Sequence, residues 1–150
     1  MRYLIGAGNY SMSDDGIGLH IIEYIAGHGL ARGFEAIDLA AGALGILSYL
    51  DPSTEKLLIV DCMKSNRRPG EHFFFSPGDV MTRKQLAGFS THEDDILKTL
   101  KLAAAAGHHI PPVRIMGIEP SETGPAMELS AVLRGRLDSY AQLAIGELLA

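Results

Sequence analysis

Apolar positions along the chain fall into two kinds of segment, short runs that predict β-strands and longer stretches with helical spacing. The short runs, bounded by glycine, proline or polar residues, predict strands at residues 3–5, 34–39, 57–60, 72–76 and 113–118. Apolar residues three or four positions apart predict helices at residues 17–25, 44–50 and 94–106, and a last helix that begins near Ser130. That last helix carries one apolar stripe, formed by Leu133, Leu137, Tyr140, Ala144 and Leu148.

The connection between the third and fourth predicted strands fixes their relative direction. Only residues 62–71 separate them, and this segment contains Pro69-Gly70. Parallel neighbours need a crossover of about a dozen residues or more, usually a helix. We therefore expect the fourth strand to run antiparallel to the third.

Alternating strands and helices predict an α/β fold, a three-layer α/β/α sandwich of the phosphorylase/hydrolase-like kind. Its twisted five-stranded sheet is expected to be mostly parallel, with one antiparallel strand. The continuous apolar run at residues 57–60 is typical of a central strand covered on both faces. Ligands of such sheets gather outside the carboxyl ends of the parallel strands, which is where we expect the chemistry.

Composition narrows the function classes. At 150 residues and 16.1 kDa, with 47% hydrophobic and 21% charged residues, the chain is expected to form one domain over residues 1–150. A net charge of -5 argues against nucleic acid as a partner. The lone Cys62 and the absence of a secretory pattern at the start of the sequence favour a cytoplasmic protein. No apolar run approaches the roughly 20 residues that span a bilayer, so membrane insertion is not expected.

A glycine turn follows the first predicted strand, but it does not match a dinucleotide-binding fingerprint. In that fingerprint a third glycine would follow Gly6 and Gly8 at position 11, where helix and strand pack closely. The sequence has Ser11 there, and the turn continues to Asp14-Asp15 before the helix. Nicotinamide and flavin binding are therefore disfavoured.

Three residues at strand ends and helix starts are candidates for chemistry. Asp61 directly follows the apolar run at residues 57–60, Asp15 precedes the first helix, and His92 precedes the helix at residues 94–106. Two carboxylates and an imidazole can bind a divalent transition metal and leave positions open for water or substrate. Each residue also has a structural explanation. Asp15 can meet the positive end of the first helix while Asp14 caps it, Asp61 can form a cap or loop hydrogen bond, and His92 can be a hydrogen-bonded surface or packing residue. Spacing alone does not bring the three together.

A series of short segments resembles the hydrogenase maturation endopeptidases, which trim the C-terminus of the large subunit of nickel-iron hydrogenases. The resemblance runs almost end to end. In chain order the segments are Gly6-Ala7-Gly8-Asn9, Asp14-Asp15-Gly16-Ile17-Gly18, Leu58-Ile59-Val60-Asp61, Pro69-Gly70-Glu71, Ser90-Thr91-His92, Gly117-Ile118-Glu119-Pro120 and Leu129-Ser130. The family fold, a twisted five-stranded sheet between helices, agrees with the strands expected from periodicity.

The resemblance implies a nickel-dependent endopeptidase, a hydrolase with Asp15, Asp61 and His92 as metal ligands and catalytic residues. Its implied partner is a nickel-loaded [NiFe] hydrogenase large-subunit precursor, which presents the nickel itself; another divalent metal could replace nickel in vitro. The implied enzyme is a monomer. Asp15 or Asp61 could instead act as a general base, which the sequence does not distinguish from a ligand role.

The sequence also departs from the family pattern. Family members commonly carry a GGT-like or GGS-like turn after the second strand, whereas Ala40-Ala41-Gly42-Ala43 has no hydroxyl residue. Cys62 is expected to be a small buried filler, and the remaining histidines surface or packing residues. Two rival functions stay open: a non-catalytic metal-site checkpoint or chaperone of the same fold, and an esterase similar to peptidyl-tRNA hydrolase.

Overall fold

The computed structural model describes the backbone of residues 1–82 and 91–150, and the side chains of residues 1–79 and 96–150. Its strands are β1 (Arg2–Gly6), β2 (Glu35–Asp38), β3 (Lys56–Cys62), β4 (His72–Phe75) and β5 (Val113–Ile118). Its helices are α1 (Ile17–Gly27), α2 (Pro77–Thr82), α3 (Thr91–Ala105), α4 (Ala131–Arg134) and α5 (Leu137–Leu149), with the 3-10 helices η1 (Ser13–Gly16) and η2 (Ala43–Tyr49). None of the described helices is long and apolar enough to cross a membrane.

The five strands form one sheet in the order β2-β1-β3-β5-β4. The β1–β2, β1–β3 and β3–β5 pairs are parallel, whereas β4 pairs with β5 in antiparallel register, from His72 opposite Ile118 to Phe75 opposite Ile115. The predicted direction of the fourth strand relative to the third is therefore correct. Its hydrogen-bonded neighbour is β5, which places β4 at the edge of the sheet.

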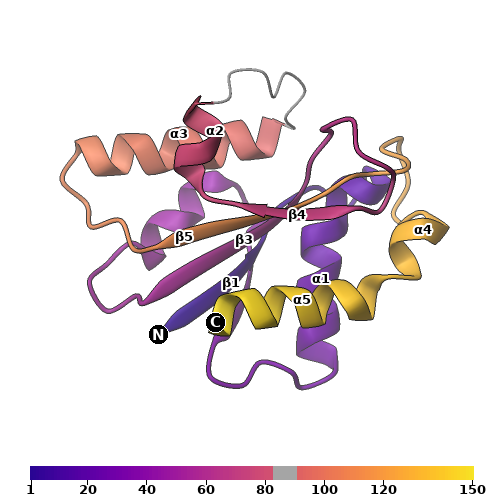
Figure 1. Ribbon diagram of the computed structural model, residues 1–150, viewed down its shortest axis with the longest axis horizontal. Helices are drawn as coiled ribbons and strands as arrows, with labels where there is room; N and C mark the ends of the chain where they lie inside the picture. The colour runs from indigo at the N-terminus through magenta and orange to yellow at the C-terminus, as the bar shows by residue number, and fades with distance from the viewer. Residues whose placement is uncertain (83–90) are drawn as a thin grey trace.

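Helices cover both faces of the sheet (Figure 1). Successive strand residues alternate between two apolar cores, so Leu58 and Val60 of β3 pack with α1 and α5, whereas Leu57 and Ile59 pack with η2 and α3. Both faces of β3 are thus buried, as its continuous apolar run predicts. The three-layer α/β/α sandwich is confirmed.

The elements differ from the prediction where local signals compete with periodicity. The bounds predicted for β5 agree with the structure, and the stripe residues of the last helix are buried or half-buried. That helix is divided, however, because α4 ends at Arg134, with Gly135 as its C-cap, and α5 starts at Leu137. Ser130 does cap α4, accepting a hydrogen bond from the Leu133 amide at 3.4 Å. The short α2 was not predicted, since six residues carry too little periodicity.

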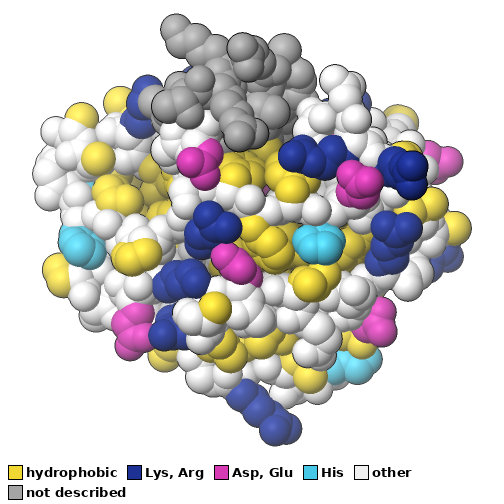
Figure 2. Space-filling model, in the orientation of Figure 1, with side chains coloured by type: hydrophobic (Ala, Val, Ile, Leu, Met, Phe, Trp, Pro, Cys, Tyr) yellow, Lys and Arg dark blue, Asp and Glu magenta, His cyan; other side chains and the backbone are white. Residues whose placement is uncertain are grey.

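Basic and acidic side chains are interspersed over the surface. Figure 2 shows Lys and Arg side chains on both the left and the right of the face in view, and the right-hand ones lie where, in Figure 1, the loop between β3 and β4 is close to α4. This side adjoins the carboxyl ends of the parallel strands (Figure 1).

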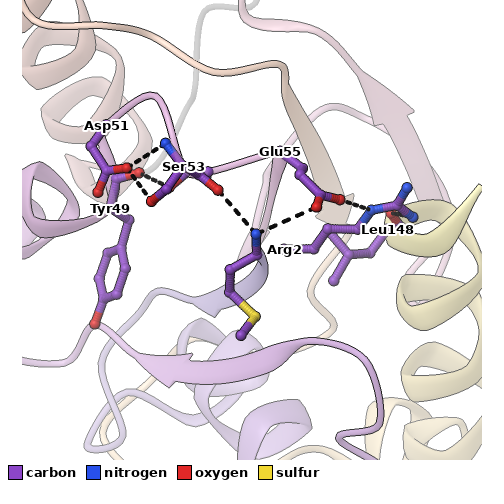
Figure 3. A network of polar contacts seen from close by, with 8 residues as sticks. Arg2, Tyr49, Asp51, Ser53, Glu55 and Leu148 are labelled. Atoms are coloured by element: carbon purple, nitrogen blue, oxygen red, sulfur yellow. Dashed lines mark hydrogen bonds and ion pairs between the residues drawn. The ribbon is translucent and has the colours of Figure 1, made fainter.

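A polar network fixes the opposite, amino edge of the sheet (Figure 3). The terminal amine of Met1 donates to the Ser53 carbonyl at 3.0 Å, and Arg2 Nε donates to Glu55 Oε2 at 3.2 Å. Arg2 Nη1 also reaches the Leu148 carbonyl of α5 at 3.3 Å. The start of β1 is thereby tied both to the turn before β3 and to the last helix.

Candidate functional site

Chain connections leave the sheet on opposite faces between β1 and β3. The connection from β1 passes through α1 on one face, whereas η2 and α3 lie on the other. In an open α/β sheet such a reversal opens a crevice at the carboxyl ends of the two strands, and ligands bind there. Asp15 lies in η1, which follows β1 along the chain, and Asp61 is the last residue but one of β3. The structure therefore places both predicted aspartates beside the switch point.

The glycines after β1 bring Asp15 to this position by allowing close backbone contacts. A Cβ on Gly18 would lie 2.3 Å from the Val60 carbonyl oxygen, and a Cβ on Gly8 would lie 2.1 Å from the Asp15 carbonyl oxygen. Gly8 also has a φ of +137°, which side chains rarely adopt. The amide of Asn9 donates to the Asp15 carbonyl at 3.3 Å. The glycine turn thus packs η1 and α1 onto the sheet, a role unrelated to phosphate binding.

Asp61 is a fully buried charged residue, with 0% of its surface exposed. Its Oδ1 accepts a hydrogen bond from the Cys62 amide at 2.8 Å. Ile59 and Met63 on either side belong to the core beneath η2 and α3, so strand alternation puts Asp61 on that face. A carboxylate buried at the carboxyl end of a central strand lies where α/β sheets keep their ligand groups, so its position favours a functional role.

The third predicted ligand, His92, has a side chain outside the described residues. Its backbone lies in the first turn of α3, which begins at Thr91, and not in the loop before the helix as predicted. That polar turn has no apolar periodicity, which is why the sequence pattern placed the start of the helix at residue 94. Ile96 of α3 lines a cavity together with Ala7 and Gly8, so the amino end of α3 lies at the carboxyl edge. Position 92 is therefore near the crevice, on the sheet face that carries Asp61.

Among the described side chains, no three from His, Cys, Asp or Glu lie close enough together to hold a metal ion. The predicted set of Asp15, Asp61 and His92 includes the side chain of His92, which lies outside the described residues. The set stays a prediction.

Asp14 has a structural role that differs from the predicted one. The N-cap of α1 is Gly16, and no described side chain caps that helix. The buried Asp14 carboxylate instead accepts three backbone amides, those of Ser121 and Glu122 at 2.9 Å and that of Ser130 at 2.8 Å. It ties η1 to the segment between β5 and α4, and this fixes the adjacent Asp15.

Glu119 was missed as a structural residue at the same edge of the sheet. It directly follows β5 and is only 7% exposed. Its Oε1 accepts the Ser65 amide at 2.8 Å, the Ser65 hydroxyl at 3.0 Å and the Arg67 amide at 3.0 Å. The rule that singled out Asp61, a carboxylate ending a buried strand, also applies to Glu119 and would have found it.

Two hollows lie beside the glycine turn. One, of about 130 Å³, is lined by Ala7, Gly8, Leu39, Ala40, Gly42, Ala43 and Ile96. The other, of about 350 Å³, is lined by Gly8, Asn9, Tyr10, Ser11, Ala40 and Met127. Ala40, from the loop without a hydroxyl residue, borders both, so this loop forms a largely apolar wall with no charged side chain.

Tyr10 holds the wall of the larger hollow in place. Its hydroxyl donates to Glu23 Oε1 of α1 at 2.8 Å, and its ring meets that of His20 edge-on at 5.3 Å. Burial and the hydrogen bond to the Glu23 carboxylate raise the pKa of Tyr10, so its hydroxyl stays protonated at neutral pH.

His20 and His28 take part in ring contacts, and His72, His108 and His109 are exposed, as predicted for surface or packing residues. Cys62 is buried and 1% exposed, consistent with a filler.

The chain matches one protein family and is similar in fold to several solved structures. The model of one protein family, described as hydrogenase maturation protease, matches residues 19–147. The fold is similar to that of the [NiFe] hydrogenase maturation protease HybD from Thermococcus kodakarensis, with a TM-score of 0.79, 22% identity and 98% of each chain covered. HybD from E. coli also gives a TM-score of 0.79, at 19% identity over 98% of this chain and 91% of that one. A hydrogenase 2 maturation peptidase from a Thaumarchaeota archaeon is 25% identical, with a TM-score of 0.68 and coverage of 98% and 97%.

Proposed function

Because the chain belongs to the hydrogenase maturation protease family, we propose that it is an endopeptidase that removes the C-terminal peptide of a [NiFe] hydrogenase large-subunit precursor. The proposal includes nickel recognition: the substrate arrives with its nickel bound, and the protease cuts only when that ion is present. It also includes action as a monomer in the cytoplasm. The observation that carries the proposal is the fully buried Asp61 at the switch point of a fold in this family.

The proposed site uses oxygen and nitrogen donors from Asp15, Asp61 and His92. Two carboxylates and an imidazole suit a divalent transition metal and leave positions free for groups that the substrate supplies. Nickel held by substrate thiolates would then be shared between the two proteins at the crevice. This positions the neighbouring peptide bond beside a polarised water, with Asp15 or Asp61 available to accept a proton.

The hollows beside the glycine turn support a polypeptide substrate. They adjoin the same turn that fixes Asp15, and no charged side chain among the described residues lines either of them. An extended peptide approaching the crevice can place small or apolar side chains there, where burial is favourable. The loop at residues 40–43 has no hydroxyl residue, so it offers a substrate no hydroxyl contact there.

A checkpoint that binds the precursor's nickel without cutting is the main rival, because it needs the same fold and ligands. Incubation of the protein with nickel-loaded and with nickel-free precursor, followed by intact-mass measurement, separates the two. The proposal predicts loss of the C-terminal peptide from the nickel-loaded precursor only. Binding without any mass change would favour the checkpoint, and cleavage of both precursor forms would remove nickel from the mechanism. An esterase acting on peptidyl-tRNA would leave both precursors intact and hydrolyse that ester instead.

The resting protein is expected to hold metal weakly. Three protein ligands leave the site open, whereas structural zinc sites are closed by four. Elemental analysis after chelator dialysis should therefore find far less than one metal ion per chain. Stoichiometric metal would indicate a resident catalytic ion.

A further inference from the structure

Five cationic side chains surround the loop between β3 and β4 and the α4–α5 junction. We call this surface the basic rim; it consists of Lys64, Arg67, Arg68, Arg134 and Arg136, all exposed. It holds five of the 13 Lys and Arg residues in a chain of net charge -5. Figure 2 shows Lys and Arg side chains on this side of the molecule, among others elsewhere on the same face.

No ion pair among the described side chains neutralises a cation of the basic rim. The ion pairs found among the described residues join Glu55, Glu23 and Glu147 to cations or histidine elsewhere, and none of them uses a residue of the rim. Arg67 lies over the Phe73 ring, with its Cζ 3.6 Å from the ring centroid. Arg134 donates weakly to the Leu129 carbonyl at 3.4 Å. The charges are therefore available to an external anion.

Buried contacts hold the two halves of the basic rim together. Glu119 binds the amides of Ser65 and Arg67, as described above, and the Gly70 amide donates to the Glu119 carbonyl at 2.8 Å. The Tyr140 hydroxyl of α5 donates to the Gly70 carbonyl at 2.5 Å. A Cβ on Gly70 would lie 2.8 Å from Arg136 Nη1, so the guanidinium rests directly on the loop. A preorganised surface loses less entropy when it binds a partner.

We propose that the basic rim docks an acidic segment of the polypeptide substrate, and this identification of the partner rests on the proposed function. The loop that carries the rim starts at the end of β3, immediately after Asp61 and Cys62. A polypeptide whose cleavage region lies in the crevice can therefore continue past this loop. An acidic stretch there gains charge complementarity, which speeds encounter and fixes the direction in which the chain lies.

The residue types favour carboxylates on a peptide over a nucleic acid or a lipid surface. Four of the five cations are arginines, whose planar guanidinium pairs with a carboxylate through two parallel hydrogen bonds. Phosphate offers similar geometry. Nucleic-acid binding, however, needs many cations against a polyanion, and the acidic remainder of the chain would repel it. The adjoining crevice, in a family of proteases, makes a peptide the fitting partner.

The test uses a double variant that removes two rim charges, with a matched control that also removes two. Arg68→Gln with Arg134→Gln removes two exposed charges whose side chains take no part in the buried contacts that hold the rim together, and Lys98→Gln with Lys101→Gln removes two exposed charges from α3. The probe is a fluorescein-labelled peptide of eight glutamates, whose binding to the full chain is followed by anisotropy at low and high salt. This readout needs neither nickel nor cleavage, so it is independent of the proposed activity.

Wild type and the α3 control are expected to bind the peptide equally and to lose it at high salt. The rim variant should bind about fivefold more weakly, from two exposed ion pairs each worth up to about 0.5 kcal/mol. With precursor as substrate, the same variant should raise KM and leave kcat unchanged. Equal peptide binding by all three proteins overturns the proposal. The proposal is also overturned if the rim binds a single-stranded oligonucleotide, or vesicles rich in phosphatidylserine, more tightly than it binds the glutamate peptide. Rim-dependent peptide binding without any precursor cleavage would uphold the docking surface and count against the proposed protease activity alone.

Discussion

Two neighbouring aspartates in η1 perform different tasks. Asp14 is buried with three amide donors on its carboxylate, whereas the side chain of Asp15 is only partly buried. A segment with Asp-Asp before a helix does not reveal which residue is structural. Only the contacts with residues 121–130, far away in sequence, distinguish them.

Replacing each aspartate by asparagine is expected to separate stability from activity. Asp14→Asn turns one acceptor oxygen into an NH₂ group facing an amide donor, which should cost about 2–3 kcal/mol, or a melting temperature about 5 to 10 °C lower. Asp15→Asn should melt near the wild type and yet lose precursor cleavage. Thermal unfolding by circular dichroism and intact-mass cleavage assays measure the two effects. If Asp14→Asn proves as stable as wild type, the anchoring role is wrong.

A local rule can locate a residue along the chain, but it does not reveal a distant partner. Asp61 was identified because it ends an apolar strand, and the structure places it at the sheet's carboxyl edge. Glu119 ends β5 in the same way, but its task depends on the loop at residues 65–67, whose turn has no regular pattern. The assignment of His92 as a ligand rests on family resemblance and stays a prediction.

At the scale of elements, α1 depends on a glycine where it crosses the sheet. We expect Gly18→Ala to destabilise the fold by at least about 2 kcal/mol, because overpacking forces backbone apart. The added Cβ would lie 2.3 Å from the Val60 oxygen and 2.5 Å from the Ala7 oxygen.

Gly27→Ala in the same helix is the matched control, since a Cβ there meets nothing within 4 Å. It should leave stability unchanged or raise it by up to about 1 kcal/mol through helix propensity. Chemical denaturation of both variants gives the two free energies of unfolding. Similar values for the two variants would contradict the close approach of α1 to β1 and β3.

The loop between β3 and β4 should open when Glu119 is removed. Glu119→Ala leaves the amides of Ser65 and Arg67 without their acceptor, at a cost of about 1–3 kcal/mol. Limited trypsin digestion should then cut faster after Lys64 and Arg67 than in wild type. Glu71→Ala removes an exposed acid from the same loop and should leave the digestion rate unchanged. Equal digestion of all three proteins would show that Glu119 does not hold the loop.

Element bounds followed from sequence where packing and pattern agree. The strand at Val113–Ile118 has the predicted bounds because its residues alternate between two buried cores. The last helix was predicted as one because its apolar stripe continues across Gly135, although the chain bends there to bring Tyr140 against Gly70. Such a tertiary contact has no counterpart in helical periodicity.

At the scale of the molecule, the polar network at the amino edge makes stability depend on pH. The hydrogen bond from Arg2 and the positive N-terminus lower the pKa of Glu55, and hydrogen bonds from Ser53 lower that of Asp51. A lowered folded-state pKa stabilises the protein above the ordinary values of 4.5 and 3.8, and this stabilisation is lost as pH falls. We expect the melting temperature to fall as pH drops from 6 to about 3.

Glu55→Gln tests the source of this dependence. The variant should melt below wild type at pH 6, and the difference should vanish at low pH, where Glu55 is protonated in both folded and unfolded chains. Melting curves over the pH series measure it. A constant difference at every pH would assign the effect to packing instead of charge.

The sequence predicts the fold class of the whole molecule, but it does not predict the strand order that forms the candidate site. Alternation of strands and helices indicates the sandwich, yet the order β2-β1-β3-β5-β4 comes from which helix covers which face. That order sets the switch point between β1 and β3 and so brings Asp15 and Asp61 to one edge. Sequence spacing carries no such information, because the two residues lie far apart along the chain.

The central claim is that Asp15, Asp61 and His92 form the site where a nickel-loaded precursor is cut. Its most direct test is the rate at which that precursor loses its C-terminal peptide, followed by intact mass, for wild type, Asp61→Asn and His92→Ala. Both variants are expected to keep the wild-type circular dichroism spectrum and to cleave at least about 100-fold more slowly, as expected when a metal ligand is lost. Cleavage at the wild-type rate by both folded variants would contradict the claim.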